Sequence, residues 1–282
     1  MRVLVTGGAG FVGTNLIKRL LKEGHEVISI DNYKTGFKDN HQPGATYIFF
    51  DIRNITDYSS WGPIDVVYHL AAIARIQPSF KEPIDYFTTN ANSTLLIAQY
   101  CAKNNIPLVY AGSSSHHSGK FKNPYTFSKD VGEEIINLYQ IHFGLKASTT
   151  RFYNVYGPHH LKEGGYCTLI GKWEKAIEDG NSLTIYGDGT KRRDFTHIDD
   201  IIDALVLINE KQAWGNVFEL GRGKNYSIKD IADMFNKNIV YEDNKPGEAD
   251  VTLCDYSVAK EVLGWEPIIN IEDYIKDYLC KK

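Results

Sequence analysis

The first 31 residues constrain the fold of this chain more than any other stretch. They read as a β-branched strand over residues 2–6, a glycine turn over 7–13, an amphipathic helix over 14–23 and a strand over 26–30. Gly8, Gly10 and Gly13 form a GxGxxG spacing between strand and helix, and Asp31 follows the second strand. An acid about 20 residues after such a turn is typical of a dinucleotide-binding βαβ unit.

Each residue type in this stretch has a physical task. Glycines permit the tight turn and let backbone N–H groups approach a pyrophosphate, while the helix N-terminus offers partial positive charge. Asp31 is expected to accept a hydrogen bond from a ribose 2′-hydroxyl and to repel a 2′-phosphate. Asn32 and Tyr33 follow it rather than an arginine, so the sequence favours NAD over NADP. An ordinary βαβ turn whose glycines only make room is the alternative.

Composition narrows the class of protein. The 282 residues carry a net charge of −4, so no basic surface argues for a nucleic-acid partner. The four cysteines include no CxxC pair, which suits a reducing cytosol and argues against a zinc site or a disulfide framework. The chain opens on a core strand and has no apolar run near the roughly 18 residues that a bilayer requires. A cytoplasmic protein with no membrane contact is expected.

Two further strands are predicted before the middle of the chain. One ends at Asp51, which could contact an adenine amino group or cap a turn, and the pattern does not decide between these roles. The apolar run at 64–72 is typical of a buried parallel strand, followed by small residues where a cofactor could approach the backbone. His69 lies inside this run and is expected to be a core histidine.

A candidate catalytic pair follows the next helix and strand. A helix is expected at 90–105 and a strand at 106–115, which ends in three serines. Tyr125 and Lys129 then lie at i and i+4, and therefore on one helical face. A cation about 4 Å from a phenolate contributes roughly 4 kcal/mol at an effective dielectric of 20, or about three pKa units. Tyr125 could then act as a general base near neutral pH.

These motifs in this order resemble the extended short-chain dehydrogenase/reductase family. The resemblance includes TGGAGFVG, Asp31, DIRN, HLAA, the serine strand and YxxxK, and continues through RFYNVYGP, LTIYGDGTKRRDFTHIDDI and KPGEADVTLCDYSVAKEVLGWEP. It covers nearly the whole chain. The later segments are most similar to the NAD-dependent nucleotide-sugar epimerase/dehydratase branch, nearest to UDP-glucose 4-epimerase.

The resemblance implies roles for individual residues. Tyr125 would be the base, Lys129 would hold the nicotinamide ribose, and Ser113 or Ser114 would bond the sugar 4-hydroxyl, with Ser115 the less favoured serine. The cofactor NAD would contact a longer set: Gly7, Gly10, Phe11, Val12, Gly13, Asp31, Asn32, Asp51, Ile52, Leu70, Ala71, Ala72, Asn90, Tyr125, Lys129 and Phe152. A helix N-cap is the structural alternative for Asn90.

The nucleotide-diphosphate sugar would contact a second set of residues, which comprises Ser113, Ser114, Asn154, Tyr186, Arg193, Lys245 and Thr252. Arg193 and Lys245 would hold the diphosphate, and Tyr186 would pack on the base unless it is a core residue. Asp194 is expected to orient its loop. Thr252 stands where some hexose-only epimerases have a bulky tyrosine, so an N-acetyl group is expected to fit.

The expected architecture is an α/β fold in two parts. A doubly wound parallel sheet of Rossmann type would comprise residues 1–156 and 195–220, and a smaller α/β substrate lobe would comprise 157–194 and 221–282. Relatives dimerise through a four-helix bundle, which the helices from Asn92 and Thr126 would supply here. The His pairs 116/117 and 159/160 have no carboxylate or cysteine at ligand spacing, so no metal site is expected.

The predicted reaction is epimerisation at C4 of UDP-glucose or UDP-galactose, and of the N-acetylated pair, through a transient 4-keto sugar. The alternatives are a dehydratase, a reductase, a decarboxylase or a non-catalytic NAD-binding regulatory protein. Dehydratases and decarboxylases of this family carry acidic residues beside the serine, where this chain has Ser114, Ser115 and His116. Epimerisation requires no additional acid.

Overall fold

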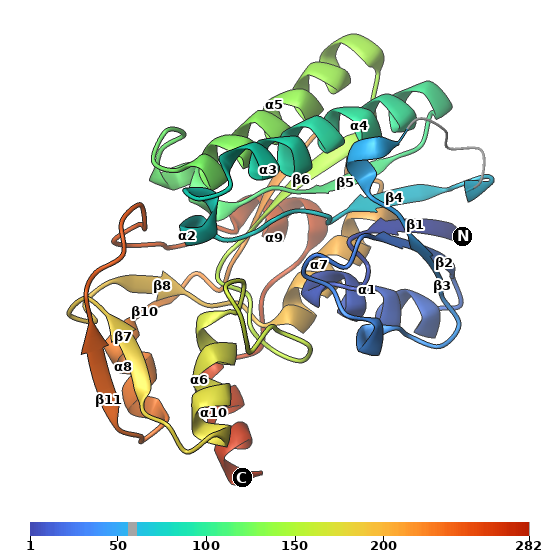
Figure 1. The fold of residues 1–282 in the computed structure, drawn as a ribbon. Coiled ribbons are helices and arrows are strands. Elements are labelled where there is room, and N and C mark those ends of the chain that lie inside the picture. The colour runs from blue at the N-terminus through green and yellow to red at the C-terminus, as the bar shows by residue number, and fades with distance from the viewer. Residues whose placement is uncertain (56–60, 282) are drawn as a thin grey trace.

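A seven-stranded parallel sheet forms the centre of the fold, in a computed structural model that describes residues 1–55 and 61–281 (Figure 1). Its spatial order is β3-β2-β1-β4-β5-β6-β9. The strands are β1 (Arg2–Thr6), β2 (Glu26–Asp31), β3 (Thr46–Phe49), β4 (Val66–His69), β5 (Leu108–Ala111), β6 (Ala147–Phe152) and β9 (Val217–Leu220). The order reverses between β1 and β4, and such a reversal opens a crevice at the carboxyl ends of the strands.

Helices cover both faces of this sheet. One face carries α1 (Phe11–Lys22), α7 (Ile198–Glu210) and α9 (Ser257–Leu263), and the other carries α3 (Pro83–Phe87), η4 (Thr88–Asn92), α4 (Ser93–Asn104) and α5 (Pro124–Phe143). Successive strand residues alternate between the two layers, so that Val3 and Val5 join one core cluster and Leu4 joins the other. The predicted doubly wound α/β fold is confirmed.

A smaller lobe lies beside the sheet, at the lower left in Figure 1. It contains β7 (Leu183–Tyr186) parallel to β11 (Ile239–Glu242), β8 (Arg192–Asp194) antiparallel to β10 (Asn225–Ser227), α6 (Leu169–Glu178), α8 (Ile228–Met234) and α10 (Ile271–Cys280). Trp173 and Phe235 pack edge to face in its separate core. The predicted lobe boundaries stay a prediction, but Leu263 of α9 belongs to the core of the sheet rather than to that of the lobe.

Two helices begin earlier than the sequence pattern predicted. Gly10 caps α1, so this helix starts at Phe11, inside the glycine turn. The helix expected at 90–105 is preceded by helical residues from Pro83, because proline at the first helical position is favourable, and a π-helical segment joins α3 to α4. None of the described helices is both long and apolar enough to cross a bilayer.

The buried histidine of β4 is a structural residue, as predicted. His69 is 1% exposed and its ring bridges two threonines, with Nδ1 2.7 Å from Thr6 Oγ1 and Nε2 3.1 Å from Thr94 Oγ1. Burial lowers its pKa to about 3, so the ring is neutral. These contacts tie β1, β4 and α4 together directly behind the crevice.

Short elements complete the chain where it turns at the crevice. They are η1 (Lys38–Asn40), η2 (Ile52–Asn54), α2 (Ile76–Ser79) and η5 (Ser114–Ser118). Three of them follow sheet strands β3, β4 and β5, so they lie at the edge where parallel strands end.

Candidate active site

One large cavity runs from the carboxyl ends of the sheet strands to the smaller lobe, with a volume of about 750 Å³. Nearly all of the predicted site residues line it. The predicted residues that line it are Gly7, Gly10, Phe11, Val12, Gly13, Asp31, Asn32, Ile52, Leu70, Ala71, Ala72, Ser113, Ser114, Tyr125, Lys129, Phe152, Asn154, Tyr186, Arg193, Lys245 and Thr252. Asp51 and Asn90 lie outside this lining.

The glycine turn at one end is built for close backbone approach. Gly7 has φ +74°, and a Cβ there would lie 2.8 Å from the backbone of Ala71. A Cβ on Gly13 would lie 2.3 Å from the Gly7 carbonyl oxygen. Gly10 caps α1 with no side chain that could accept from the first helical amides, and the residues that carry these amides line the cavity. These residues fit the pyrophosphate of a dinucleotide.

Asp31 anchors the turn as well as facing the cavity. Its carboxylate accepts from Ala9 N at 2.9 Å and from Tyr33 N at 2.7 Å. Burial raises the pKa of Asp31, while both amides act in the opposite direction. A carboxylate has about four acceptor positions, so it retains capacity for a ribose hydroxyl.

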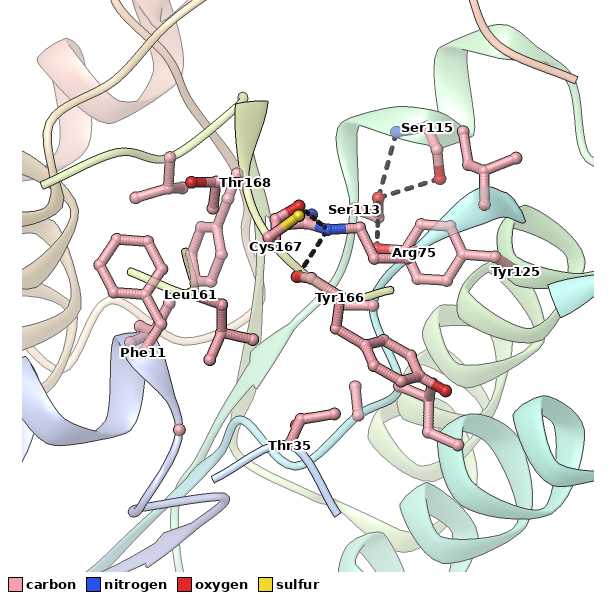
Figure 2. Close-up of a pocket in the computed structure, with 18 of the residues that line it drawn as sticks. Phe11, Thr35, Arg75, Ser113, Ser115, Tyr125, Leu161, Tyr166, Cys167 and Thr168 are labelled. Atoms are coloured by element: carbon pink, nitrogen blue, oxygen red, sulfur yellow. Dashed lines mark hydrogen bonds between the residues drawn. The ribbon is translucent and has the colours of Figure 1, made fainter. Parts of the chain in front are cut away.

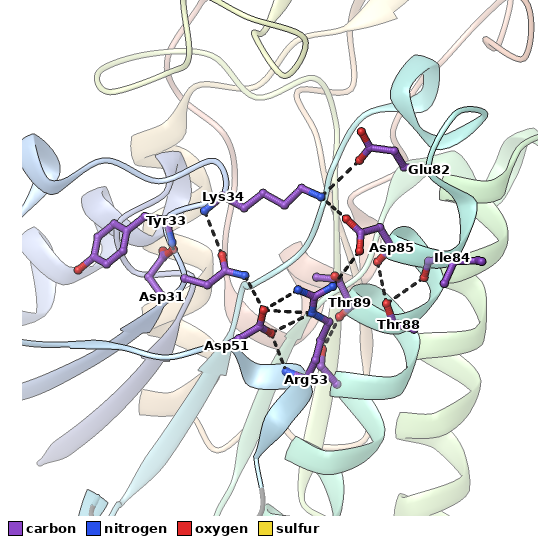
Figure 3. A network of polar contacts seen from close by, with 12 residues as sticks. Asp31, Tyr33, Lys34, Asp51, Arg53, Glu82, Ile84, Asp85, Thr88 and Thr89 are labelled. Atoms are coloured by element: carbon purple, nitrogen blue, oxygen red, sulfur yellow. Dashed lines mark hydrogen bonds and ion pairs between the residues drawn. The ribbon is translucent and has the colours of Figure 1, made fainter.

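An ion-pair network surrounds the next turn (Figure 3). Asp51 caps η2 and pairs with Arg53, whose Nη2 lies 2.6 Å from Asp51 Oδ2, and this hydrogen bond lowers the pKa of Asp51 to about 2. Asn32 donates to the same carboxylate at 3.1 Å. Arg53 and Lys34 both reach Asp85 of α3. Asp51 thus has the turn-capping role, and its contact with adenine stays a prediction.

Asn90 requires a correction of its alternative role as a helix N-cap, while its contact with NAD stays a prediction. It lies inside the continuous helical stretch rather than at a helix N-cap. Its amide is 1% exposed and bonds the backbone of Ile73 in both directions, accepting from Ile73 N at 2.8 Å and donating to Ile73 O at 3.0 Å. Nδ2 also donates to Ser128 Oγ at 3.0 Å. Asn90 therefore positions the loop after β4 from behind the cavity wall.

Tyr125 and Ser113 meet at the wall of the cavity (Figure 2). Tyr125 lies in the first turn of α5, where Asn123 caps the helix, and its hydroxyl donates to Ser113 Oγ at 3.1 Å. Ser113 Oγ also lies 2.9 Å from Ser115 Oγ. Of the two candidate serines, Ser113 is the one hydrogen-bonded to the tyrosine, while Ser114 lines the cavity without that bond.

The predicted electrostatic effect of Lys129 on Tyr125 is wrong in this structure. Lys129 Nζ donates to the Ala111 carbonyl and lies 4.5 Å from the centroid of the Tyr110 ring. Burial raises the pKa of Tyr125 above its usual value, and the groups that act against this rise are Ser113 and Arg75. The i, i+4 spacing does place both side chains at one cavity wall, but Lys129 turns toward the strand end. Burial lowers the pKa of Lys129 to about 8.

The lobe supplies the cationic end of the cavity. Tyr186 ends β7 and is held between two lysines: Lys245 Nζ lies 3.3 Å from its ring centroid, and Lys172 Nζ donates to its hydroxyl at 2.7 Å. Since Tyr186 lines the cavity, it is not the core residue of the alternative interpretation. Arg193 bonds the carbonyl of Arg192 at 3.0 Å and lies 3.6 Å from Glu248.

Asp194 fixes the backbone beneath the lobe end of the cavity. It is fully buried and accepts from three backbone amides, those of Arg222, Gly223 and Cys254, at 2.8 to 3.0 Å. Its expected loop-orienting role is confirmed. Asn154 donates to the Asp194 carbonyl at 2.7 Å and to Thr252 Oγ1 at 3.3 Å, so both of these predicted substrate residues are fixed in place.

The histidine pairs have carboxylate partners that the sequence did not reveal. His116 lies 2.9 Å from Asp130, His117 lies 2.8 Å from Glu219, and His160 lies 2.9 Å from Glu174. Each histidine is far from its carboxylate partner in the sequence, and the fold brings the two together. Within residues 1–55 and 61–281, no group of three or more ligating side chains could hold a metal ion.

Arg75 was missed by sequence reasoning. It follows β4 in a run of small apolar residues, enters the cavity beside Tyr125, and donates from Nε to the carbonyl oxygens of Tyr166 and Cys167 at 3.0 Å each (Figure 2). A single arginine within such a run was the available signal. The loop that it contacts lies 91 and 92 residues away in sequence, which no local pattern could indicate.

Comparisons with known proteins agree with this site. Residues 3–221 match the NAD dependent epimerase/dehydratase family. The UDP-glucuronate 4-epimerase of Thermodesulfobacterium geofontis is 31% identical over 307 residues, covering 97% of this chain and 93% of the relative.

Solved structures of similar proteins cover the whole chain. A UDP-glucose 4-epimerase from Thermotoga maritima with UDP-glucose has a TM-score of 0.92 at 28% identity, over 100% of this chain and 99% of the other. A UDP-glucuronic acid 4-epimerase from Bacillus cereus, in complex with UDP-glucuronic acid and NAD, has a TM-score of 0.91 at 29% identity over the same shares. The protein is therefore an enzyme of the NAD dependent epimerase/dehydratase family.

Proposed function

We propose that this enzyme is an NAD-dependent UDP-sugar 4-epimerase. The observation that carries the proposal is the hydrogen bond between Tyr125 and Ser113, inside a cavity that also contains the glycine turn. A base bonded to a serine at that point can address a secondary hydroxyl from one side. The glycine turn would place an oxidised nicotinamide within the same cavity.

The residues of the chain divide the work. Tyr125 would take the proton of the sugar 4-hydroxyl, and Ser113 would hold that oxygen through its own hydroxyl. NAD, when bound, would supply reversible hydride transfer at C4. Lys129 would hold the nicotinamide ribose, because its ammonium lies at the same cavity wall as Tyr125. The cofactor residues predicted from the sequence, from Gly7 to Phe152, would hold the rest of the dinucleotide.

The lobe would hold the UDP moiety. Arg193 and Lys245 would neutralise the diphosphate, Tyr186 would pack on the uracil, and Asn154 would contact sugar or phosphate. Arginine can bind phosphate bidentately, whereas lysine acts as a point charge. The small Thr252 side chain would leave room for an N-acetyl group, so UDP-GlcNAc and UDP-GalNAc join UDP-glucose and UDP-galactose as candidate substrates.

The site lacks the acidic group that a dehydratase would require. Elimination of water needs an acid and a base next to the catalytic serine, yet Ser114 and Ser115 occupy those positions. His116, the next residue, is tied to Asp130 and 42% exposed. A non-catalytic NAD-binding protein would have no use for the Tyr125–Ser113 pair.

We also propose a homodimer in the cytoplasm. Helices α4 and α5 lie side by side on the outer face of the sheet layer (Figure 1) and expose Leu95, Leu138, Ile141 and Phe143. Apolar side chains gathered on two adjacent helices are typical of a helical interface. The same pair of helices from a second copy would complete a four-helix bundle. Two of the four free cysteines, Cys101 and Cys254, are buried, which suits a reducing compartment.

A substrate panel tests the reaction. Purified enzyme with NAD is incubated with UDP-glucose, UDP-galactose, their N-acetylated and C6-carboxylated counterparts, and the products are identified by NMR. Epimers at C4 are expected. A 6-deoxy-4-keto product would identify a dehydratase, a UDP-pentose would identify a decarboxylase, and nucleotide binding without turnover of any sugar would support a regulatory protein.

A further inference from the structure

Arg75 is a cation placed at the reacting end of the cavity. It leaves β4 as the residue before α2, and its side chain lies beside Tyr125 and Ser113 (Figure 2). Only its Nε is used within the described part of the chain, donating to the carbonyl oxygens of Tyr166 and Cys167. The two Nη atoms, with four N–H groups, have no hydrogen-bond partner among those residues.

The charge of Arg75 has no counter-ion in the part of the chain that the structure describes. The groups that act on its charge are Tyr125, Cys167 and Tyr86, none of which is a carboxylate, and burial lowers the pKa of the guanidinium. Arg75 is partly buried and lines the cavity, so its guanidinium faces the space that a ligand would fill. An anion bound there would pair with a charge that no acid of the described residues neutralises.

The other cations of the cavity have tasks elsewhere. The cationic residues of its lining are Lys34, Arg75, Lys129, Lys172, Lys191, Arg193 and Lys245, against the acids Asp31 and Glu248. Lys34 pairs with Asp85, Lys191 and Arg193 share Glu248, and Lys172 and Lys245 flank Tyr186 in the lobe. Lys129 is bonded to Ala111. Arg75 is thus an additional charge beyond those that a dinucleotide and a UDP group would engage.

We propose that Arg75 binds the C6 carboxylate of a UDP-hexuronate, so that this enzyme prefers uronic acid sugars over neutral hexoses. The proposal rests on the 4-epimerase function and specifies its substrate class. C6 is attached to C5, the ring carbon next to the reacting C4. When Tyr125 contacts the 4-hydroxyl, a carboxylate at C6 would therefore lie close to Arg75, which is beside Tyr125.

Guanidinium and carboxylate match in geometry as well as in charge. The planar fork of arginine donates two parallel N–H bonds to a carboxylate, and Arg75 keeps its Nη groups available for this while Nε holds the loop at Tyr166 and Cys167. A neutral hydroxymethyl group at C6 would leave the guanidinium unpaired. Preference for the acid then comes both from the new ion pair and from this penalty on the neutral sugar.

The test is the ratio of kcat/KM for UDP-glucuronate to that for UDP-glucose, in the wild type, Arg75→Gln and Arg75→Lys. Glutamine removes the charge but keeps an amide that can donate to the loop carbonyls, and lysine keeps the charge without the fork. Lys120→Gln is the matched control, because it removes a positive charge outside the cavity, where Lys120 pairs with Glu134. Effects on Tyr125 that are common to both sugars cancel in the ratio.

We expect the wild type to favour UDP-glucuronate, Arg75→Gln to lower the ratio by at least about 30-fold, and Arg75→Lys to lie between them. The control should leave the ratio unchanged. An equal loss for both sugars in Arg75→Gln, or a wild-type preference for UDP-glucose, overturns the proposal and leaves the epimerase function standing.

Binding measurements keep the two hypotheses separable. Calorimetry gives the affinity of UDP-glucuronate, UDP-glucose and UDP itself for each variant, and UDP affinity should be the same in all of them. If no sugar is turned over, the epimerase proposal fails, while a loss of affinity confined to UDP-glucuronate in Arg75→Gln would still support the carboxylate site. Equal affinity for both sugars in wild type and variant contradicts it.

Discussion

Ser113 differs from its neighbours because of a single hydrogen bond. The backbone turns from β5 into η5 at this residue, which brings Oγ to the Tyr125 hydroxyl, while Ser114 begins the 3₁₀ helix beside it. Both serines therefore line the cavity, but only Ser113 is hydrogen-bonded to Tyr125. Their different contacts allow the role of the tyrosine partner to be measured directly.

Replacing each serine by alanine should separate them. Ser113→Ala is expected to lower kcat by about 10- to 100-fold, since it removes a positioned hydroxyl at the reacting oxygen, and Ser114→Ala is expected to cost less. Steady-state kinetics on the best UDP-sugar of the panel provides the measurement. Equal losses, or a larger loss for Ser114→Ala, would assign the contact to Ser114.

The pKa of Tyr125 gives a second prediction at this scale. Burial raises it in the free enzyme and Arg75 acts against the rise, so the base form should increase as pH rises above neutrality. We expect kcat/KM for a neutral UDP-hexose to rise with pH, and Arg75→Gln to move this rising limb to higher pH. A pH–rate profile of the two proteins checks this. Superimposable profiles would show that Arg75 does not act on the tyrosine.

Sequence reasoning succeeded for residues whose roles follow from local pattern. The glycine turn, Asp31 and the position of Tyr125 are fixed by short-range spacing, and all of them line the cavity. It failed where a long-range contact decides. Lys129 turns to the Ala111 carbonyl, Asn90 bonds the Ile73 backbone, and Arg75 meets a loop from the other part of the molecule.

At the scale of elements, the helix of 83–104 shows how tertiary contacts alter a local pattern. The apolar spacing predicted a start at Asn90. Pro83 instead opens the helix, and the π segment at 88–92 turns Asn90 inward against Ile73 and Ser128. The start of a helix depends on what its first turn packs against, which the sequence alone does not state.

The link among β1, β4 and α4 predicts a pH-dependent stability. The pKa of His69 is lowered to about 3 in the folded protein, below its unfolded value of 6.5, so the unfolded state binds more protons between these values. The stabilisation is complete above pH 6.5 and is lost as pH falls. Between pH 7.5 and pH 5, His69 should cost about 2 kcal/mol of unfolding free energy.

Urea denaturation of the wild type and His69→Gln at both pH values measures this contribution. The variant removes the titrating ring and should lose about 2 kcal/mol less than the wild type over the same interval. Equal losses in the two proteins would mean that the pH dependence arises from other groups.

At the scale of the whole molecule, the sheet domain and the lobe both supply residues to the cavity. The sheet contributes the glycine turn, Ser113 and Tyr125, and the lobe contributes Tyr186, Arg193 and Lys245. The fold class could be predicted from apolar runs and glycine turns. The exact division could not, because α9 returns from the lobe's part of the sequence to pack on the sheet.

The proposed dimer is also a property of the whole molecule. Ile141→Glu places a charge on the exposed apolar face of α5, and it should convert the dimer to a monomer at micromolar concentration. Ile268→Glu is the matched control, because Ile268 is 73% exposed, against 66% for Ile141, and lies before α10. Sedimentation velocity gives the masses. A dimer that survives Ile141→Glu, or that is lost equally in both variants, would place the interface elsewhere.

The most direct test of the proposed reaction follows the hydrogen on C4. A UDP-hexose carrying deuterium at C4, chosen as the best substrate of the panel, is converted by the wild type and by Tyr125→Phe, and the product is read by NMR and mass spectrometry. We predict the C4 epimer with deuterium kept at C4, and a rate lower by about 10²- to 10⁴-fold for Tyr125→Phe. Deuterium found at C6, or lost to solvent, or full activity of Tyr125→Phe, would contradict the proposed mechanism.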